Sequence, residues 1–221
     1  KVLRMAAHLL EAAEEDLELA DGEVRVTGSD VSITIKQVAE ACSGAPGYSM
    51  PGGIEPGLEA SDNFKPSALT YSNGVQAVEV EVDTGTGEVR FLNYVVVSDC
   101  GTLINPMIVD GQIAGGVVHG IGNALFEWMG YDEKGQPLTT NFGEYTMPTA
   151  TELIHLDLQY EHSPTPLNPL GVKGVGETGT VPAAAAIVSA VENALEPFGA
   201  RLSDYPVKPA KIVEIVRGRE V

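Results

Sequence analysis

Two alternating runs decide the fold: Val75-Gln-Ala-Val-Glu-Val-Glu-Val-Asp83 and, after Thr84-Gly85-Thr86-Gly87, Glu88-Val-Arg-Phe-Leu-Asn-Tyr-Val-Val-Val97. Alternation with a period of two places apolar side chains on one face of a strand. The glycine-rich link between the runs is typical of a turn, so the pattern predicts a β-hairpin. Because residues 94–97 are continuously apolar, we expect the end of the second strand to be buried on both faces.

Downstream, the break at Asn105-Pro106 is followed by an apolar stretch that predicts a helix over residues 107–129. Each glycine inside a helix costs about 0.5–1 kcal/mol relative to alanine, so a high glycine density needs a reason. The sequence therefore predicts that something approaches the backbone of this helix closely. Its glycines are Gly111, Gly115, Gly116, Gly120 and Gly122.

The remainder of this half predicts a hairpin or strand pair over residues 131–161, a proline-rich run over 163–169, and a last helix over 182–195. Thr180 is a candidate cap for that helix, and Pro182 suits its first turn. Between the proline-rich run and the helix lies a glycine-dense loop, Gly171-Val-Lys-Gly-Val-Gly-Glu-Thr-Gly179.

Upstream, helical spacing of apolar residues over 2–17 predicts an amphipathic helix, and Asp21-Gly22 predicts a tight hairpin over 17–27. A strand at 31–33 and a helix at 35–42 complete a small α/β unit. Residues 43–66 contain four prolines and five glycines, which indicates an irregular excursion. We therefore expect an α+β fold of mixed sheets with flanking helices, divided into residues 1–66 and residues 67–221.

The charge balance excludes some classes of partner. The 221 residues include 13 Lys and Arg against 31 Asp and Glu, giving a net charge of -18. Such a surface repels phosphate backbones and anionic lipid, so neither nucleic acid nor a membrane is an expected partner. The sequence contains no long apolar window and no secretion signal, which predicts a cytoplasmic location. The start at Lys1, without an initiator Met, indicates a piece of a longer polypeptide.

The two cysteines, Cys42 and Cys100, form no Cys-x-x-Cys pair. They therefore provide neither a disulfide framework nor a cysteine-bound iron–sulfur cluster. Cys100 follows a buried strand and is expected to be a packed thiol. His119 is expected to be a histidine packed against neighbouring helices, and neither residue is predicted to bind metal.

Gly174, Gly176 and Gly179 fit the G-x-G-x-x-G pattern of dinucleotide-binding folds. A nicotinamide-dependent dehydrogenase is therefore one alternative. That interpretation needs an apolar strand immediately upstream, and the prolines of residues 163–169 prevent a central strand there. What remains is a loop whose backbone N–H groups can hold an anionic ligand before a helix.

Glu177 is the carboxylate of this loop, and it has two interpretations. It can stabilise the following helix, where a negative charge meets the positive end of the helix dipole, with Lys173 as its local partner. Alternatively, a carboxylate on a glycine loop that faces a cavity is suited to act as a general base.

Several ordered motifs resemble the molybdopterin-binding subunit of the xanthine dehydrogenase and aldehyde oxidase family, and are most similar to its carbon monoxide dehydrogenase large-chain branch. The motifs are Asp99-Cys-Gly-Thr-Leu-Ile-Asn-Pro106, Gly111-Gln-Ile-Ala-Gly-Gly116, His119-Gly-Ile-Gly122, Ala124-Leu-Phe-Glu127 and Gly171-Val-Lys-Gly-Val-Gly-Glu-Thr-Gly179. The resemblance covers residues 75–195 and extends more loosely to the first helix and hairpin.

This resemblance implies the C-terminal part of a molybdenum hydroxylase subunit that oxidises a small substrate with oxygen derived from water. Glu177 matches the family's catalytic base. The main chain of the preceding loop matches the family's cofactor contacts, which carry over to Lys173, Gly174, Val175 and Gly176. Gln112 matches a pterin contact and can both donate and accept, although an exposed glutamine at a helix start is the alternative.

The cofactor implied is molybdenum with molybdopterin, either as such or as the cytosine dinucleotide. The resemblance also implies an iron–sulfur subunit, an FAD subunit and the upstream portion of the same subunit as partners, without which the chain would be inactive. Carbon monoxide, aldehydes and N-heterocycles all remain open as substrates, because the substrate-selecting loop of the family is not found. A non-catalytic domain that acts only in assembly or partner binding is the alternative function.

Overall fold

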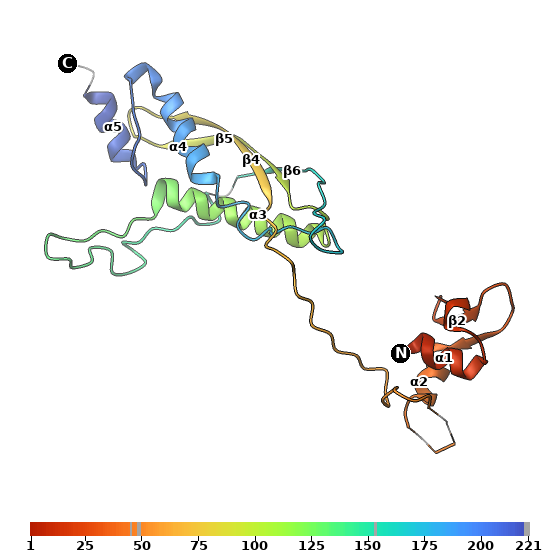
Figure 1. The fold of residues 1–221 in the computed structure, drawn as a ribbon. Helices are drawn as coiled ribbons and strands as arrows, with labels where there is room; N and C mark the ends of the chain where they lie inside the picture. Colours follow the sequence, from red (N-terminus) through yellow and green to blue (C-terminus); the bar gives the residue numbers. More distant parts are fainter. Residues whose placement is uncertain (45, 48–49, 153, 219–221) are drawn as a thin grey trace. The chain divides into compact units, whose positions relative to one another are not determined.

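The computed structural model describes residues 1–44, 46–47, 50–152 and 154–218. The chain separates into two compact units, Lys1–Lys65 and Pro66–Val221 (Figure 1). Each unit has its own hydrophobic core. No helix within the described ranges is both long and apolar enough to cross a membrane.

The first unit packs two helices against a three-stranded antiparallel sheet of order β1-β2-β3. Its core contains the fully buried Met5, Val24 and Val38. In chain order the elements are α1 (Val2–Leu10), the 3-10 turn η1 (Glu14–Asp16), β1 (Leu17–Ala20), β2 (Glu23–Val26), β3 (Ser32–Thr34) and α2 (Ile35–Ala41).

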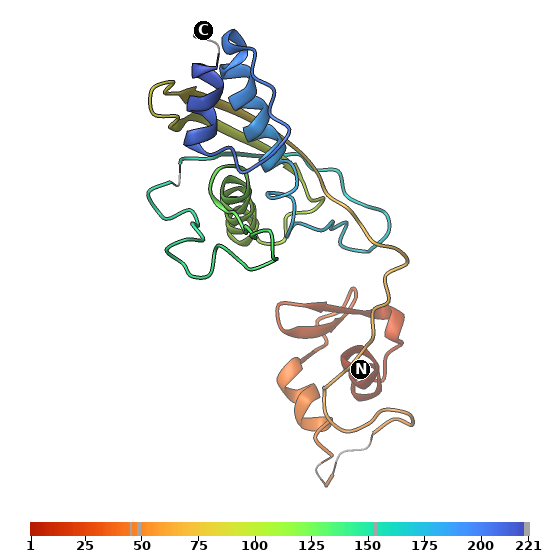
Figure 2. The ribbon, with the colours of Figure 1, turned by 90° about the vertical axis from the view of Figure 1, so that its left-hand side faces the viewer.

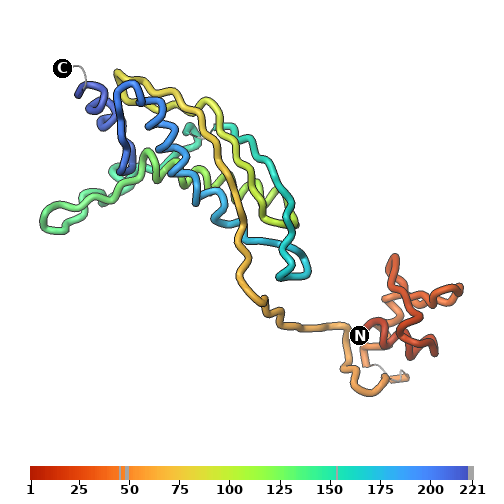
Figure 3. Tube along the Cα trace, turned by 45° about the horizontal axis from the view of Figure 1, so that its top comes forward, coloured from red at the N-terminus to blue at the C-terminus, as the bar shows by residue number. Residues whose placement is uncertain are grey.

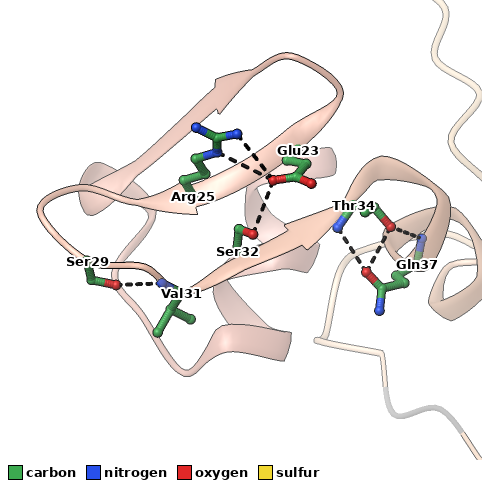
Figure 4. Close-up of polar contacts among 7 residues, drawn as sticks. All are labelled: Glu23, Arg25, Ser29, Val31, Ser32, Thr34 and Gln37. Carbon is green, nitrogen blue, oxygen red and sulfur yellow. Dashed lines mark hydrogen bonds and ion pairs between the residues drawn. The ribbon is translucent and has the colours of Figure 1, made fainter.

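Local signals account for most of this unit. The predicted hairpin is confirmed: Ala20 pairs with Glu23, and Asp21 and Gly22 take φ angles of 51° and 80°, as a tight two-residue turn requires. The helix expected over 35–42 is also confirmed. Thr34 and Gln37 cap it reciprocally, since the Thr34 side chain accepts from the Gln37 N–H and the Gln37 side chain accepts from the Thr34 N–H (Figure 4).

The first helix is shorter than predicted. It ends at Leu10, not at residue 17, because Glu11 adopts a left-handed conformation with φ 50° and ψ 38°. Residues 14–16 then form a 3-10 turn, and Leu17 pairs with Val26 in β1. Strand pairing within the unit thus overrides the helical spacing of the apolar residues.

The second unit is built on a mixed three-stranded sheet of order β4-β5-β6. β4 (Asn73–Val82) and β5 (Val89–Asp99) form the predicted antiparallel hairpin, and β6 (Asp157–Tyr160) pairs parallel with β5. The main helices are α3 (Pro106–Ile121), α4 (Ala183–Ala194) and α5 (Pro209–Arg217). Helix α4 packs on β4 and also on α3 (Figures 1 and 2). With this mixed sheet and its helices, the α+β class is confirmed.

The end of β5 is buried mainly on one face. Tyr94 and Val96 are 2% and 1% exposed, whereas Val95 and Val97 are only half-buried. The prediction of burial on both faces was therefore wrong. The helices α3 and α4 contribute to the core on the Tyr94 side, with Ile113, Val117, Ile187 and Val191 among its buried residues.

The helix predicted over 107–129 ends earlier. It begins after Asn105, whose side chain accepts from the Ile108 N–H, with Pro106 as its first residue. The α-helix stops at Ile121 and a π-helical turn, η2 (Gly122–Phe126), closes it. The Glu127 N–H bonds to the Gly122 carbonyl, which is the wider spacing of that turn.

The strand pair predicted over 131–161 is mostly absent from the described residues. Residues 130–152 follow η2 as a long excursion (Figure 3). They contain no regular strand, apart from one bridge between Tyr131 and Pro137. Asp132 provides the local order, because its carboxylate accepts from the N–H groups of Lys134 and Gln136. β6 pairs with β5 and not with this segment.

The predicted last helix is confirmed as α4, but Thr180 does not cap it. Pro182 occupies the cap position, and it makes no side-chain hydrogen bond there. After the 3-10 turn η3 (Glu196–Phe198), the chain forms α5, which was not predicted. Ile212 and Val216 of α5 are buried in the core, at helical spacing behind Pro209.

Candidate functional site

The glycine-dense loop 171–179 begins as an extension of the end of β5. Gly101 and Val172 form an antiparallel bridge. The Thr102 N–H donates to the Gly171 carbonyl at 3.2 Å, and the Lys173 N–H donates to the Cys100 carbonyl at 2.8 Å. The sheet therefore fixes the first residues of the loop.

Side chains from β4 and the segment before it hold the end of the loop. Ser72 Oγ lies 2.6 Å from Thr178 Oγ1, and Gln76 Nε2 donates to the Gly179 carbonyl at 2.8 Å. Gln76 is held in turn by the buried Tyr94, whose hydroxyl donates to Gln76 Oε1 at 2.6 Å. The loop is thus restrained at both ends by the β4–β5 hairpin.

At two positions of α3, other parts of the chain pack so closely that only glycine fits. A Cβ on Gly116 would lie 2.9 Å from Gly179 Cα, and a Cβ on Gly120 would clash with Ala183 of α4. The expected close approach to the α3 backbone is therefore made at these two positions by the loop and by α4. By contrast, a Cβ on Gly111 or Gly115 would meet no heavy atom within 4 Å.

Between its two fixed ends, the loop presents unused backbone donors. The N–H groups of Val175, Gly176 and Glu177 have no hydrogen-bond partner among the described residues. The Val175 side chain packs against the core, while Gly176 is exposed, and a Cβ on it would meet no heavy atom within 4 Å. Three successive free donors are suited to an anionic group.

Glu177 lies in this part of the loop and lines an open pocket of about 400 Å³. Its side chain is exposed and makes no hydrogen bond within the part of the chain that the structure describes. Two exposed apolar side chains, Tyr71 and Val181, share the pocket with it. The remaining lining residues are Ser72, Asn73, Gly74, Thr178 and Pro182.

Lys173 does not pair with Glu177. Its Nζ lies 2.8 Å from Asp99 Oδ2, and the two side chains are 10% and 13% exposed. Burial raises the pKa of Asp99, but hydrogen bonds from Lys173, Gly101 and Ser163 outweigh it and hold that pKa below its usual value. The Glu177 carboxylate is therefore left without the local partner that the sequence suggested.

Gln112 lies on the exposed side of α3, one turn before Gly116, and it does not line the pocket of Glu177. The structure thus brings α3 and the end of the loop together, without placing the Gln112 and Glu177 side chains in one cavity. His119 is exposed on the same helix, so the expectation of a packed histidine was wrong. Cys100 is buried as expected, and this burial raises the pKa of its thiol.

Sequence reasoning missed the residues that hold the loop, namely Asp99, Ser72, Gln76 and Thr178. Asp99 begins one of the family motifs, but its partner is 74 positions away along the chain. No group of three or more His, Cys, Asp or Glu side chains in the described ranges is placed to hold a metal ion.

Comparison with known proteins identifies the family. Residues 1–154 match the family described as "Molybdopterin cofactor-binding domain". The chain is 42% identical over 219 residues to the nicotine 6-hydroxylase large subunit of Paenarthrobacter nicotinovorans. The aligned region covers 99% of this chain and 27% of that relative. The chain therefore spans about a quarter of the length of the curated relatives that it matches.

Solved structures agree. Quinoline 2-oxidoreductase from Pseudomonas putida 86 matches with a TM-score of 0.88 and 38% identity, over 99% of this chain and 28% of that one. Reconstituted CO dehydrogenase from Oligotropha carboxidovorans matches with a TM-score of 0.89 and 33% identity, over 100% and 27%. The resemblance that the sequence motifs suggested is thus confirmed: the chain belongs to the molybdopterin cofactor-binding domain family, within the large subunits of the xanthine dehydrogenase and aldehyde oxidase type.

Proposed function

We propose that this chain is part of a molybdenum hydroxylase or dehydrogenase that oxidises a small substrate with oxygen derived from water, and that Glu177 is its general base. The observation that carries the proposal is the position of this carboxylate. It lies on a loop fixed at both ends, beside three free backbone N–H groups, and it lines a pocket. A carboxylate on a held backbone, with no other partner among the described residues, is suited to accept a proton as a general base.

The residues of the loop and of α3 fit a flat anionic cofactor. The free N–H groups of Val175 and Gly176 would bind its anionic edge, and Gly111 and Gly115 leave an open backbone surface on α3. Gln112, exposed on the same helix, offers both a donor and an acceptor to a pterin ring. When bound, molybdopterin would supply the molybdenum redox centre.

Lys173 and Gly174 would hold the loop in place and would not bind the cofactor through their N–H groups. Their N–H groups already donate to the carbonyls of Cys100 and Thr70, and the Lys173 ammonium binds Asp99. Within the loop, the main-chain donors that remain for the cofactor would therefore be those of Val175, Gly176 and Glu177.

Glu177 would accept a proton during the oxidation of substrate, which requires its carboxylate to be ionised before the reaction. With Lys173 bound to Asp99, no ammonium group of the loop competes for the Glu177 oxygens. The neighbouring Tyr71 and Val181 present exposed apolar surface on the same pocket, against which a flat substrate or cofactor ring could lie.

The rest of the enzyme is assigned by analogy with the relatives. We propose that the remaining portion of the same subunit, an iron–sulfur subunit and an FAD subunit complete it, and that the cofactor is molybdopterin or its cytosine dinucleotide form. The names of the relatives include nicotine, quinoline and CO, so the substrate is assigned here only as a small molecule. We also propose a cytoplasmic location, a compartment in which thiols such as those of Cys42 and Cys100 stay reduced.

The test is the Glu177→Gln substitution in the complete subunit assembled with its partner chains. Turnover is measured with carbon monoxide, benzaldehyde and quinoline as separate substrates, together with the molybdenum content. We expect normal molybdenum content and a turnover at least ~100-fold lower with whichever substrate the parent oxidises. Glu88→Gln, an exposed glutamate in the β4–β5 turn, is the matched control and should change turnover less than ~2-fold.

Near-normal turnover of Glu177→Gln would remove the assigned role. A parent protein that retains molybdopterin but oxidises none of these substrates would favour the alternative, a domain that acts only in assembly.

A further inference from the structure

The ion pair between Asp99 and Lys173 joins three segments that lie far apart in the sequence. Asp99 Oδ2 binds Lys173 Nζ at 2.8 Å. Asp99 Oδ1 accepts from the Gly101 N–H at 3.0 Å and from the Ser163 N–H at 3.2 Å. The end of β5, the proline-rich run and the loop of Glu177 therefore meet at one carboxylate.

We propose that Asp99 and Lys173 are a positioning pair, which fixes the loop so that the Glu177 carboxylate lies where the reaction needs it. This inference rests on the proposed function of Glu177. Neither residue of the pair is placed in contact with substrate; both act through the backbone that carries the base.

The spacing along the loop supports this role. Lys173 is four residues before Glu177, and beyond Gly174, whose N–H donates to the Thr70 carbonyl, the next three N–H groups are unpaired within the described ranges. On its far side, the turn that carries Glu177 is held by the contact between Ser72 and Thr178 and by the Glu177 carbonyl, which accepts from the Thr180 and Val181 N–H groups. On the near side, this turn is reached through Lys173 and Gly174, so its position depends on how firmly these two residues are held.

The burial of the pair indicates specificity more than stability. Both side chains are nearly buried, at 13% and 10% exposed, so bringing the two charges out of water largely cancels their attraction. An apolar pair of similar size would fill the same space without directing the loop. A charged pair with both carboxylate oxygens in use selects a single geometry.

The pair can be tested with four variants of the complete, assembled enzyme: Asp99→Asn, Lys173→Met, the double variant, and Lys173→Arg. Three quantities are measured: amide hydrogen exchange of the peptide that covers residues 171–180, the thermal midpoint, and kcat and KM for the substrate that the parent oxidises. The control is Arg90→Gln, which breaks the exposed Arg90–Glu81 pair of the β4–β5 hairpin, with side chains 64% and 59% exposed.

For the single variants Asp99→Asn and Lys173→Met we expect at least ~10-fold faster exchange of the hydrogen-bonded loop amides, those of Lys173, Gly174 and Thr178. We also expect kcat to fall ~10- to 100-fold with little change in KM, as for a misplaced catalytic group. The double variant should recover the thermal midpoint, because it leaves no buried unpaired charge, but should recover neither loop protection nor kcat. Lys173→Arg should keep the loop protected, and Arg90→Gln should match the parent in all three quantities.

A merely structural pair predicts the opposite for the double variant, in which kcat and loop protection would return with the thermal midpoint. That result, or unchanged loop exchange in the single variants, would overturn the inference. If one single variant does not fold, kcat and loop exchange of the double variant still distinguish a positioning role from a merely structural one.

The failure of the proposed function would look different. In that case Glu177→Gln would keep its turnover, whereas the exchange of the loop in the four variants would still show whether the pair holds it. Faster loop exchange with unchanged kcat, in an enzyme that Glu177→Gln inactivates, would refute the positioning role alone.

Discussion

Gly116 of α3 and Gly179 at the end of the Glu177 loop are in backbone contact, since a Cβ on Gly116 would lie 2.9 Å from Gly179 Cα. A Cβ on Gly179 would in turn clash with the Ile113 carbonyl of α3. The helix and the loop can approach this closely only because both positions lack a side chain. The position of the loop is thus set by α3 as well as by the hairpin.

This contact predicts opposite effects for two adjacent glycines. Gly116→Ala should lower the free energy of unfolding by about 1–3 kcal/mol, because the Gly179 backbone must move. Gly115→Ala meets open space and should raise it by about 0.5–1 kcal/mol through helix propensity. Urea unfolding of Gly116→Ala and Gly115→Ala measures both free energies. Equal destabilisation by the two substitutions would contradict the packing described.

Gly176→Val is expected to reduce cofactor retention with little effect on folding. The residue is exposed and surrounded by open space within the described chain, so a larger side chain would block only a ligand that approaches the loop. Molybdenum content after gel filtration and the thermal midpoint are the two measurements. Gly52→Val, which also meets open space but lies in the first unit, is the control. Equal loss of cofactor in both variants would exclude a specific role for Gly176.

Tyr94→Phe should destabilise the fold by about 1 kcal/mol, because it removes the hydroxyl that holds Gln76, which in turn holds Gly179. Tyr71→Phe changes an exposed tyrosine by the same single atom and should stay within about 0.5 kcal/mol. Denaturant titrations of both variants provide the comparison. No difference between them would mean that the Tyr94 hydrogen bond contributes nothing to stability.

The Asp99 carboxyl makes stability dependent on acid pH. Its pKa in the folded protein lies below its usual value, which is about 3.9 in the unfolded chain. A depressed folded pKa contributes stability that is fully present above the unfolded pKa and is lost as pH falls through the folded pKa. Below pH ~4, thermal midpoints of the parent should therefore fall more steeply than those of Asp99→Asn. Parallel curves for the two proteins would contradict the assigned pKa direction.

Local signals predicted the elements that depend on a few neighbouring residues. The turn at Asp21-Gly22, the hairpin of β4 and β5, and the helix that begins after Thr34 all carry their own sequence pattern, and all three are confirmed. The family motifs likewise located the Glu177 loop, because its glycines and carboxylate are contiguous in the chain.

The elements set by distant contacts were not predictable in this way. The first helix stops at Leu10, where Glu11 is left-handed, and Leu17 lies instead in a strand opposite Val26. β6 pairs with β5 across the long segment 130–152, and nothing local to residues 157–160 specifies that partner. The Asp99–Lys173 pair spans 74 positions, so a single sequence gives no sign that the two charges meet.

The role of Glu177 as the base is tested most sharply by the rate at which substrate reduces the cofactor-loaded Glu177→Gln enzyme in a single turnover without oxygen. This rate isolates the step that needs the base from electron transfer to the partner chains. With molybdenum content equal to the parent, we predict reduction at least ~100-fold slower. Reduction within ~2-fold of the parent would show that the carboxylate of Glu177 is not the base.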